Sequence, residues 1–211
     1  MKNLKQKGFT LVEIAIVLVI VGLLIGGVLK GQEMITNAKL KRIESDNAGI
    51  AAAMFSYQDR YLQLPGDDNN ADTRFNVFNG QALTINGDSN GSIFGDWIGV
   101  ANTETSNFWK HLHASGLVPG GGNDATQPTN AYGGNIGIRD GSLLLSGHVT
   151  VFGSLEGPIA KILETRLDDG DPGTGRIQSD VTTVLMDGNV VSTVAVAGYV
   201  DNLRYFMAFR L

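Results

Sequence analysis

The chain begins with a short cationic segment that leads into a long apolar run. Lys2, Lys5 and Lys7 lie within the first eight residues. The 21 residues from Phe9 to Leu29 contain one charged residue, Glu13. A helix of roughly 20 apolar residues spans the hydrocarbon core of a bilayer, and cationic flanks stay on the cytoplasmic side. The pattern therefore predicts a membrane-spanning helix with its N-terminus inside and the bulk of the chain outside.

A second apolar pattern continues through the polar segment that follows. Pro65-Gly66 marks its end, because the residue before a proline disfavours the helical conformation. We predict one helix from Phe9 to about Tyr61, whose second half lays an apolar stripe on a sheet. The stripe advances by three, four or seven residues, as one face of a helix requires: Leu40, Ile43, Ile50, Met54, Tyr57, Tyr61 and Leu64.

The rest of the chain alternates glycine-rich loops with short regular segments. Residues 65–104 and 119–134 are expected to be loops, and most of the 28 glycines lie after residue 65. Short helices are predicted over Thr105–Ser115 and from Gly157 onward, with Ile159, Ile162, Leu163 and Leu167 on the apolar face of the second. A strand or a pair of strands is predicted at Leu143–Phe152. Further strands are predicted at Arg176–Gln178, Val181–Met186, Val190–Val196 and Leu203–Leu211.

Asp187-Gly188-Asn189 lies between two of these strands and is typical of a hairpin turn. A second hairpin is expected through residues 198–202, so the sheet is predicted to be antiparallel. The fold class is therefore α+β. A long N-terminal α-helix, with a membrane-spanning half at 9–30 and an amphipathic half at 31–64, packs on a C-terminal antiparallel β-sheet head with glycine-rich loops at 65–211.

Two common alternatives for the apolar run fit the sequence less well. A secretory signal peptide has a shorter apolar stretch and an Ala-x-Ala-like cleavage site, which Gly26-Gly27-Val28 does not supply. An ordinary single-pass anchor fits the hydropathy but leaves a carboxylate inside the span, where such groups usually have a partner and a function. No Lys or Arg lies within one helical turn of Glu13. Its partner is therefore expected elsewhere, for example in another subunit.

The run Lys7-Gly8-Phe9-Thr10-Leu11-Val12-Glu13, followed by apolar residues, resembles the N-terminal signature of type IV pilins and of the pseudopilins of type II secretion systems. This resemblance implies that residues 1–8 are a leader peptide, which prepilin peptidase removes between Gly8 and Phe9. It also implies that the new Phe9 amine is methylated. By the same resemblance, Glu13 pairs with the N-terminal amine of a neighbouring subunit during filament assembly.

The resemblance further implies the partners and the location of the chain. The partners are copies of itself or related pilins in a helical filament, prepilin peptidase, an inner-membrane assembly platform and membrane lipid. The expected location is the inner membrane, with a cytoplasmic N-terminus and a periplasmic head, followed by a pilus or periplasmic pseudopilus and possible exposure at the cell surface. The chain has no cysteine, so it departs from those pilins that close a C-terminal loop with a disulfide.

The negative net charge argues against general nucleic-acid binding. Removing the leader changes the formal net charge from −5 to −8, because three lysines are lost. An acidic protein is a poor general nucleic-acid binder, since phosphate neutralisation needs clustered Lys and Arg. No specific nucleic-acid partner is therefore expected.

Two acidic segments are candidate calcium sites. Asn86, Asp88, Asn90 and Asp96 partly match an oxygen-ligand calcium loop, although Trp97 stands where such a loop has glutamate. The alternative is an ordinary Asn-Gly turn cluster. Asp168, Asp169 and Asp171 place three carboxylates in four residues, and these repel unless they are solvated or bound to a cation. The alternative is a solvated turn.

No other cofactor is indicated. His111 and His113 are two residues apart in a predicted helix, so they point to different faces and are expected to be surface polar residues rather than zinc ligands. The chain lacks the G-x-S-x-G, P-loop and H-E-x-x-H motifs and has no cysteine nucleophile. The expected function is therefore non-enzymatic: a structural subunit of a type IV pilus or type II secretion pseudopilus. The alternative is a membrane-tethered surface-binding or DNA-uptake module.

Overall fold

The computed structural model describes residues 10–75, 86–181 and 198–211 of the chain. Contacts within the chain divide it into two compact units, Met1–Lys41 and Arg42–Leu211. The first helix, α1, covers Leu11–Tyr61 and contributes to both units. Over the described residues its extent agrees with the predicted helix, except that Thr10 lies just before its start.

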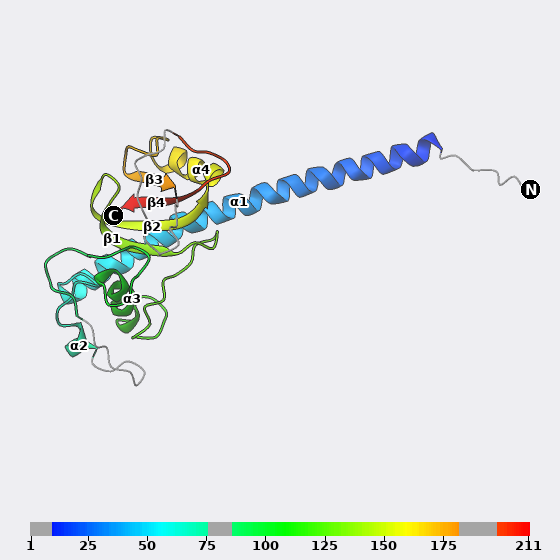
Figure 1. The fold of residues 1–211 in the computed structure, drawn as a ribbon. Coiled ribbons are helices and arrows are strands. Elements are labelled where there is room, and N and C mark those ends of the chain that lie inside the picture. The colour runs from blue at the N-terminus through cyan, green and yellow to red at the C-terminus, as the bar shows by residue number, and fades with distance from the viewer. Residues whose placement is uncertain (1–9, 76–85, 182–197) are drawn as a thin grey trace, which may run out of the picture. The chain divides into compact units, whose positions relative to one another are not determined.

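The first unit consists of the N-terminal part of α1 (Figure 1). Its large apolar side chains from Leu11 to Ile35 are exposed; Leu11, for example, is 92% exposed and Leu23 is 73% exposed. Among the described residues, α1 is the one helix that is long and apolar enough to cross a membrane, by length and composition. None of the apolar window that meets this test is buried within the chain.

The second unit is organised around the C-terminal part of α1. The predicted stripe is confirmed here, because Ile43, Ile50, Met54 and Tyr57 are all buried and Tyr61 is partly buried. Each fully buried large apolar side chain contributes about 1.5–3 kcal/mol relative to an exposed one. The burial of this stripe is therefore a main source of stability for the unit.

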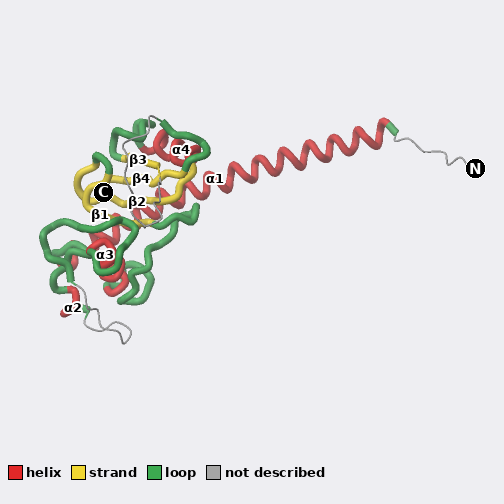
Figure 2. The backbone as a smooth tube through the Cα atoms, in the orientation of Figure 1, coloured by secondary structure: helices red, strands yellow, loops and turns green. Residues whose placement is uncertain are grey.

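An antiparallel sheet forms the other main part of the second unit, as predicted. Its strands are β1 (Ile136–Ser142), β2 (Leu145–Glu156), β3 (Ile177–Val181) and β4 (Arg204–Arg210). They are ordered β1-β2-β4-β3, and every neighbouring pair is antiparallel (Figure 2). The position of β4 between β2 and β3 makes the C-terminal strand central among the described strands.

Both faces of the sheet are covered. Successive residues of a strand point to opposite faces, so Val149 and Val151 of β2 lie on one face and Thr150 on the other. The valine face forms a buried cluster with Trp97, Phe206 and Ala208. The opposite face contacts α1, where the hydroxyl of Thr150 donates a hydrogen bond to Oδ1 of Asn47. The contact with α1 was predicted, whereas the cover supplied by the Trp97 loop was not.

Three shorter helices complete the second unit: α2 (Ala71–Arg74), α3 (Glu104–Ala114) and α4 (Gly157–Leu167). In Figure 1, α3 lies near β1 and α4 near β3, at the two ends of the sheet. The predicted helices at 105–115 and from 157 onward are thus confirmed. On α4, Ile159 and Leu163 are buried as expected, but Ile162 and Leu167 are partly exposed.

The structure revises the bounds of one predicted strand, and some of the other strand predictions lie outside the described residues. The strand predicted at Leu143–Phe152 begins two residues later, as β2 (Leu145–Glu156), because Leu143 adopts a φ of 57° at the turn between β1 and β2. The partner strand therefore lies earlier, with Ile136 opposite Phe152. Residues 182–197 are outside the described part, and they include the predicted turn at Asp187-Gly188-Asn189, the strand at Val190–Val196 and most of the strand at Val181–Met186.

His111 and His113 are also placed differently from expectation. Both are buried in α3, with exposures of 0% and 5%. Nδ1 of His111 accepts a hydrogen bond from the Gly66 N–H at 2.9 Å, and Nδ1 of His113 lies 2.8 Å from the Asp124 carbonyl oxygen. Sequence spacing alone did not reveal these partners, because they come from distant loops.

The α1 stripe can be tested with a pair of similarly shaped side chains. Met54 is 1% exposed, whereas Gln58 is exposed on the same helix. Met54→Ala is expected to lower the free energy of unfolding by about 2–5 kcal/mol, since it leaves a cavity in the core. Gln58→Ala should change it little. Denaturant unfolding of the detergent-solubilised chain, followed by tryptophan fluorescence, measures both; equal effects would contradict this assignment of the core.

Candidate functional site

The first turn of α1 carries the candidate assembly residue. Both the backbone N–H and the hydroxyl of Thr10 donate hydrogen bonds to Oε2 of Glu13, each at 2.8 Å. The Glu13 N–H in turn donates to the Thr10 hydroxyl oxygen at 3.3 Å. These reciprocal contacts form a capping box, in which a Thr and a Glu three residues later satisfy the unpaired N–H groups of a helix start.

The capping box corrects the expectation that Glu13 has no partner in its own helix. The signal was present in the sequence, because Thr-x-x-Glu before an apolar run is the pattern of this motif. Glu13 is exposed, and among the described residues no group donates a hydrogen bond to its second oxygen, Oε1. The carboxylate therefore caps the helix and retains an acceptor for another group. Gly8 and Phe9 lie outside the described residues.

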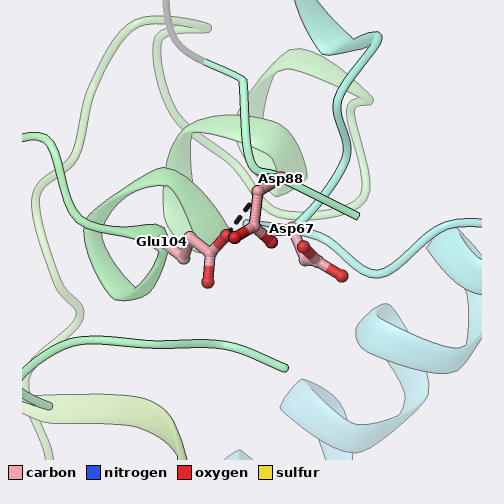
Figure 3. A group of neighbouring side chains, drawn as sticks. All are labelled: Asp67, Asp88 and Glu104. Carbon is pink, nitrogen blue, oxygen red and sulfur yellow. Dashed lines mark hydrogen bonds between the residues drawn. The ribbon is translucent and has the colours of Figure 1, made fainter. Parts of the chain in front are cut away.

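A first acidic group, the 67/88/104 cluster, consists of Asp67, Asp88 and Glu104. One oxygen from each carboxylate lies within 4.8 Å of the others. Figure 3 shows Glu104 reaching from the start of α3 toward Asp88, whose backbone N–H donates to Glu104 Oε1 at 3.2 Å. Loops that are distant in the sequence thus bring three acids together.

Backbone groups satisfy much of this cluster. The two oxygens of Asp67 accept hydrogen bonds from the N–H groups of Asn90 at 3.1 Å and Gly91 at 2.8 Å. Oε2 of Glu104 accepts one from the Phe94 N–H at 2.8 Å. Burial raises the pKa of Asp67 and of Glu104, and the nearby carboxylates add to both shifts. The cluster therefore favours retaining a proton or acquiring a positive partner.

The predicted loop of Asn86, Asp88, Asn90 and Asp96 contributes only Asp88 to this cluster. Oδ1 of Asn86 accepts a hydrogen bond from the Asp72 N–H at 3.0 Å. Oδ1 of Asn90 accepts one from the Ser92 N–H at 2.8 Å. Asn90 thus supports a local turn, whereas Asn86 joins its loop to α2. Asp67 and Glu104 were not predicted as members of this group, because they lie outside the loop in the sequence.

Asp68 anchors the segment that carries Asp67. Its side chain is fully buried. It accepts hydrogen bonds from the Tyr57 hydroxyl at 2.8 Å, the Arg74 guanidinium at 2.7 Å and the Asn70 N–H at 2.9 Å. Burial, followed by the bond to Asp68, raises the pKa of Tyr57, so the phenol stays a neutral donor. This network ties the loop after α1 to the helix itself.

A second acidic group, the 164/168/169 cluster, lies where α4 ends. Glu164, Asp168 and Asp169 each place one carboxylate oxygen within 4.8 Å of the others. Asp168 and Asp169 were candidate residues, whereas Asp171 is not part of the group and Glu164 was missed. Glu164 lies four residues before Asp168, and this helical spacing was the available signal.

The environment of Glu164 differs from that of its two neighbours. Its side chain is fully buried, and Oε2 accepts a hydrogen bond from the Tyr199 hydroxyl at 3.0 Å. Burial raises the pKa of Glu164 to about 8; the Tyr199 bond opposes this shift, and the charges of Asp168, Asp169 and Asp171 add to it. The isolated carboxyl therefore favours its neutral form near neutral pH.

Comparisons with known proteins bear on the N-terminal segment. Residues 3–29 match the family model described as the prokaryotic N-terminal methylation motif. This match confirms the resemblance that the N-terminal sequence indicates. A search among curated proteins found no match.

Among solved structures, the chain is similar to the major type IV pilin PilA1 from Clostridium difficile. The identity is 14%, the match covers 82% of this chain and 96% of that chain, and the TM-score is 0.37. At this TM-score the likeness carries no further argument. The functional conclusion therefore rests on the N-terminal motif and on the structure of α1.

The Asp68 network yields a stability prediction. Asp68→Ala leaves the buried Tyr57 hydroxyl without its acceptor and removes the partner of Arg74, so we expect a loss of about 2–4 kcal/mol in the free energy of unfolding. Asp59→Ala, on an exposed position of α1, is the matched control and should have little effect. Denaturant unfolding measures both variants, and an Asp68 variant as stable as the control would contradict the anchoring role.

Proposed function

We propose that the chain is a structural subunit of a type IV pilus or a type II secretion pseudopilus. In this proposal, prepilin peptidase cleaves it after Gly8, the amine of Phe9 is methylated, and an inner-membrane platform assembles it into a filament. The observation that carries the proposal is the methylation motif at residues 3–29. That motif includes the start of α1, whose apolar side chains from Leu11 to Leu29 are exposed.

The exposed apolar side chains of α1 are consistent with a helix that lies first in a membrane and later among other copies of the chain. Contiguous apolar surface of this size is unfavourable in water. A bilayer covers it before assembly, and the helices of neighbouring copies cover it in a filament. This role needs no enzymatic step by the chain itself. The chain is the substrate of the processing enzymes, and its helix then packs against other copies.

Glu13 is proposed to guide assembly through its free oxygen. Oε2 is held by Thr10, which fixes the carboxylate at the helix start. A methylated amine at Phe9 of a neighbouring copy carries a positive charge and N–H donors, and so complements the carboxylate. In a low-dielectric bilayer this pairing is favoured, since an isolated charge there is costly.

Two variants separate the charge of Glu13 from its capping role. Glu13→Gln keeps an oxygen that can accept from Thr10, since Gln also serves in a capping box, but it removes the charge. Thr10→Ala keeps the charge and removes the hydroxyl. We expect the Glu13 variant to insert and be cleaved yet to form few or no filaments, while the Thr10 variant assembles.

Electron microscopy and quantification of sheared filaments measure assembly, and immunoblotting of membranes measures insertion. Normal filament formation by Glu13→Gln would remove the charge of Glu13 from the mechanism. Failure of both variants would instead assign Glu13 to capping alone.

Processing is tested separately by the intact mass of the mature chain. Cells that contain prepilin peptidase should yield a chain beginning at methylated Phe9, and Gly8→Ala should slow its appearance. A wild-type chain that retains residues 1–8 in the presence of the peptidase would contradict the cleavage assignment. Abundance of the chain in sheared surface filaments would indicate a major pilin, whereas confinement to the envelope would indicate a pseudopilin or a minor component.

A further inference from the structure

A cleft opens over the valine face of the sheet. Its volume is about 580 Å³, which lies within the range of small-molecule sites. The loop that carries Trp97, the turn between β1 and β2, and Phe206 of β4 line the cleft. Oε1 of Gln178 accepts a hydrogen bond from the Leu144 N–H at 2.9 Å, which ties this turn to β3. Most of the lining side chains are apolar: Phe94, Trp97, Leu143, Leu145 and Phe206.

Arg139 contributes a positive charge to this cleft. It lies opposite Val149 in the register of β1 and β2, and opposite residues share a face of the sheet, so its side chain is on the valine face. The side chain is partly buried, and within the described residues its Nε forms no hydrogen bond and no Asp or Glu forms an ion pair with it. By contrast, each of four other arginines forms an ion pair with a carboxylate: Arg42, Arg74, Arg166 and Arg204.

Trp97 contributes a second donor without a partner. Its side chain is 5% exposed, and Nε1 forms no hydrogen bond with the described residues. The ring centroid lies 5.9 Å from that of Phe206, and a Cβ on Gly153 would come within 2.8 Å of Trp97 Cη2, so packing fixes the indole. Arg139 Nε and Trp97 Nε1 are both donors, and buried polar groups usually have partners. The groups that this cleft lacks are therefore acceptors.

The charge and the lining of the cleft define the kind of acceptor. The planar guanidinium of arginine offers two parallel N–H donors to a carboxylate, which makes this contact stronger and more specific than one to a neutral acceptor. The apolar side chains of the cleft suit an apolar group attached to that carboxylate. Asp96 also lines the cleft, and a like charge close by disfavours a multiply charged anion such as citrate or phosphate. A ligand with one carboxylate and an apolar body therefore fits best.

We propose that the cleft binds a small apolar monocarboxylate. The carboxylate of this ligand accepts hydrogen bonds from the Arg139 guanidinium, and its apolar body lies against Trp97, Leu145 and Phe206. The ligand thus supplies the arginine with a negative partner. Its body also covers apolar surface in the cleft, where Phe94 is 78% exposed. The site lies within the second unit, and the proposal does not depend on the filament role.

Trp109 provides an internal control for this site. Its Nε1 is also buried without a partner among the described residues. Trp109 lines a second cleft, of about 350 Å³, where Arg42 lies 3.7 Å from the carboxylate of Asp46. That arginine already has a carboxylate, so we expect no ligand carboxylate there. Trp97 and Trp109 are the two tryptophans of the chain, so Trp97→Phe assigns the two indole N–H signals in an NMR spectrum.

The test is NMR titration of the full, isotope-labelled and detergent-solubilised chain with phenylacetate. Phenylacetamide has the same apolar body without the charge, and it also controls for uptake into the detergent. Phenylacetate should shift the Trp97 indole signal saturably and leave the Trp109 signal unchanged. Phenylacetamide should bind about tenfold or more weakly, since a hydrogen bond to a charged group contributes that much. Arg139→Gln should lose the same factor for phenylacetate, whereas Arg60→Gln, at an exposed position of α1, should bind as wild type does.

Three results would overturn the proposal. The first is the lack of a saturable shift of the Trp97 signal, or an equal response of both tryptophan signals. The second is equal affinity for phenylacetate and phenylacetamide, which would mean that the cleft recognises only the apolar body. The third is wild-type affinity in Arg139→Gln.

Two further measurements complete the test. Tighter binding of citrate than of phenylacetate would overturn the choice of a single charge. If Arg139→Gln fails to fold, the comparison of phenylacetate with phenylacetamide on the wild-type chain still tests the recognition of charge. Arg139→Lys, which keeps the charge but loses the planar fork, then replaces the variant and should also weaken phenylacetate binding; unchanged affinity in that variant would remove Arg139 from the site.

Discussion

The apolar positions of α1 divide into those that the chain buries and those that it leaves exposed. Ile43, Ile50, Met54 and Tyr57 are covered within the second unit, and their burial supplies much of its core. Between Leu11 and Leu29 the chain supplies no cover. Within a single copy, burial of apolar surface therefore stabilises the second unit but not the first. The other unit needs lipid or further copies, and this requirement is the physical basis of an assembly subunit.

The buried carboxylates of the second unit differ in how many hydrogen-bond donors they have. Asp68 is fully buried and has a phenol, a guanidinium and a backbone N–H as donors. Asp67 is buried and has backbone donors on both oxygens. Glu164 is equally buried but has a donor on one oxygen only. The contrast matters because burial costs are similar for all three, while only Glu164 lacks compensation within the described residues.

The sequence predicted the parts of the fold that depend on local periodicity. The α1 stripe, the helix α3 and the strand β4 all follow from spacings within a few residues. It did not predict β1, where Gly137 and Gly141 interrupt the apolar pattern, nor the burial of His111 and His113. Those outcomes depend on segments that meet only after folding, such as the Gly66 N–H that donates to His111.

The candidate sites also divide into those that follow from a local sequence pattern and those that form only in the folded chain. The Thr10–Glu13 capping box is a local pattern, and it was available in the sequence although only the charge of Glu13 drew notice. Asp168 and Asp169 were found because they are adjacent. Glu164 could have been found by helical spacing, but its burial could not, since that depends on Tyr199 and the sheet. Asp67 and Glu104 are separated from Asp88 by loops, so only the folded chain brings them together.

The capping box also bears on how one carboxylate can serve both a single chain and a filament. A glutamate that lacked any local partner would be costly in a bilayer before assembly, and it would be free to adopt many orientations. The bonds from Thr10 reduce both problems, because they satisfy one oxygen and restrict the side chain to the helix start. In the proposed assembly, the second oxygen meets an incoming amine in a fixed position, so less conformational entropy is lost on pairing. The observed cap and the proposed contact between copies are therefore compatible, because the cap leaves one oxygen of Glu13 as an acceptor.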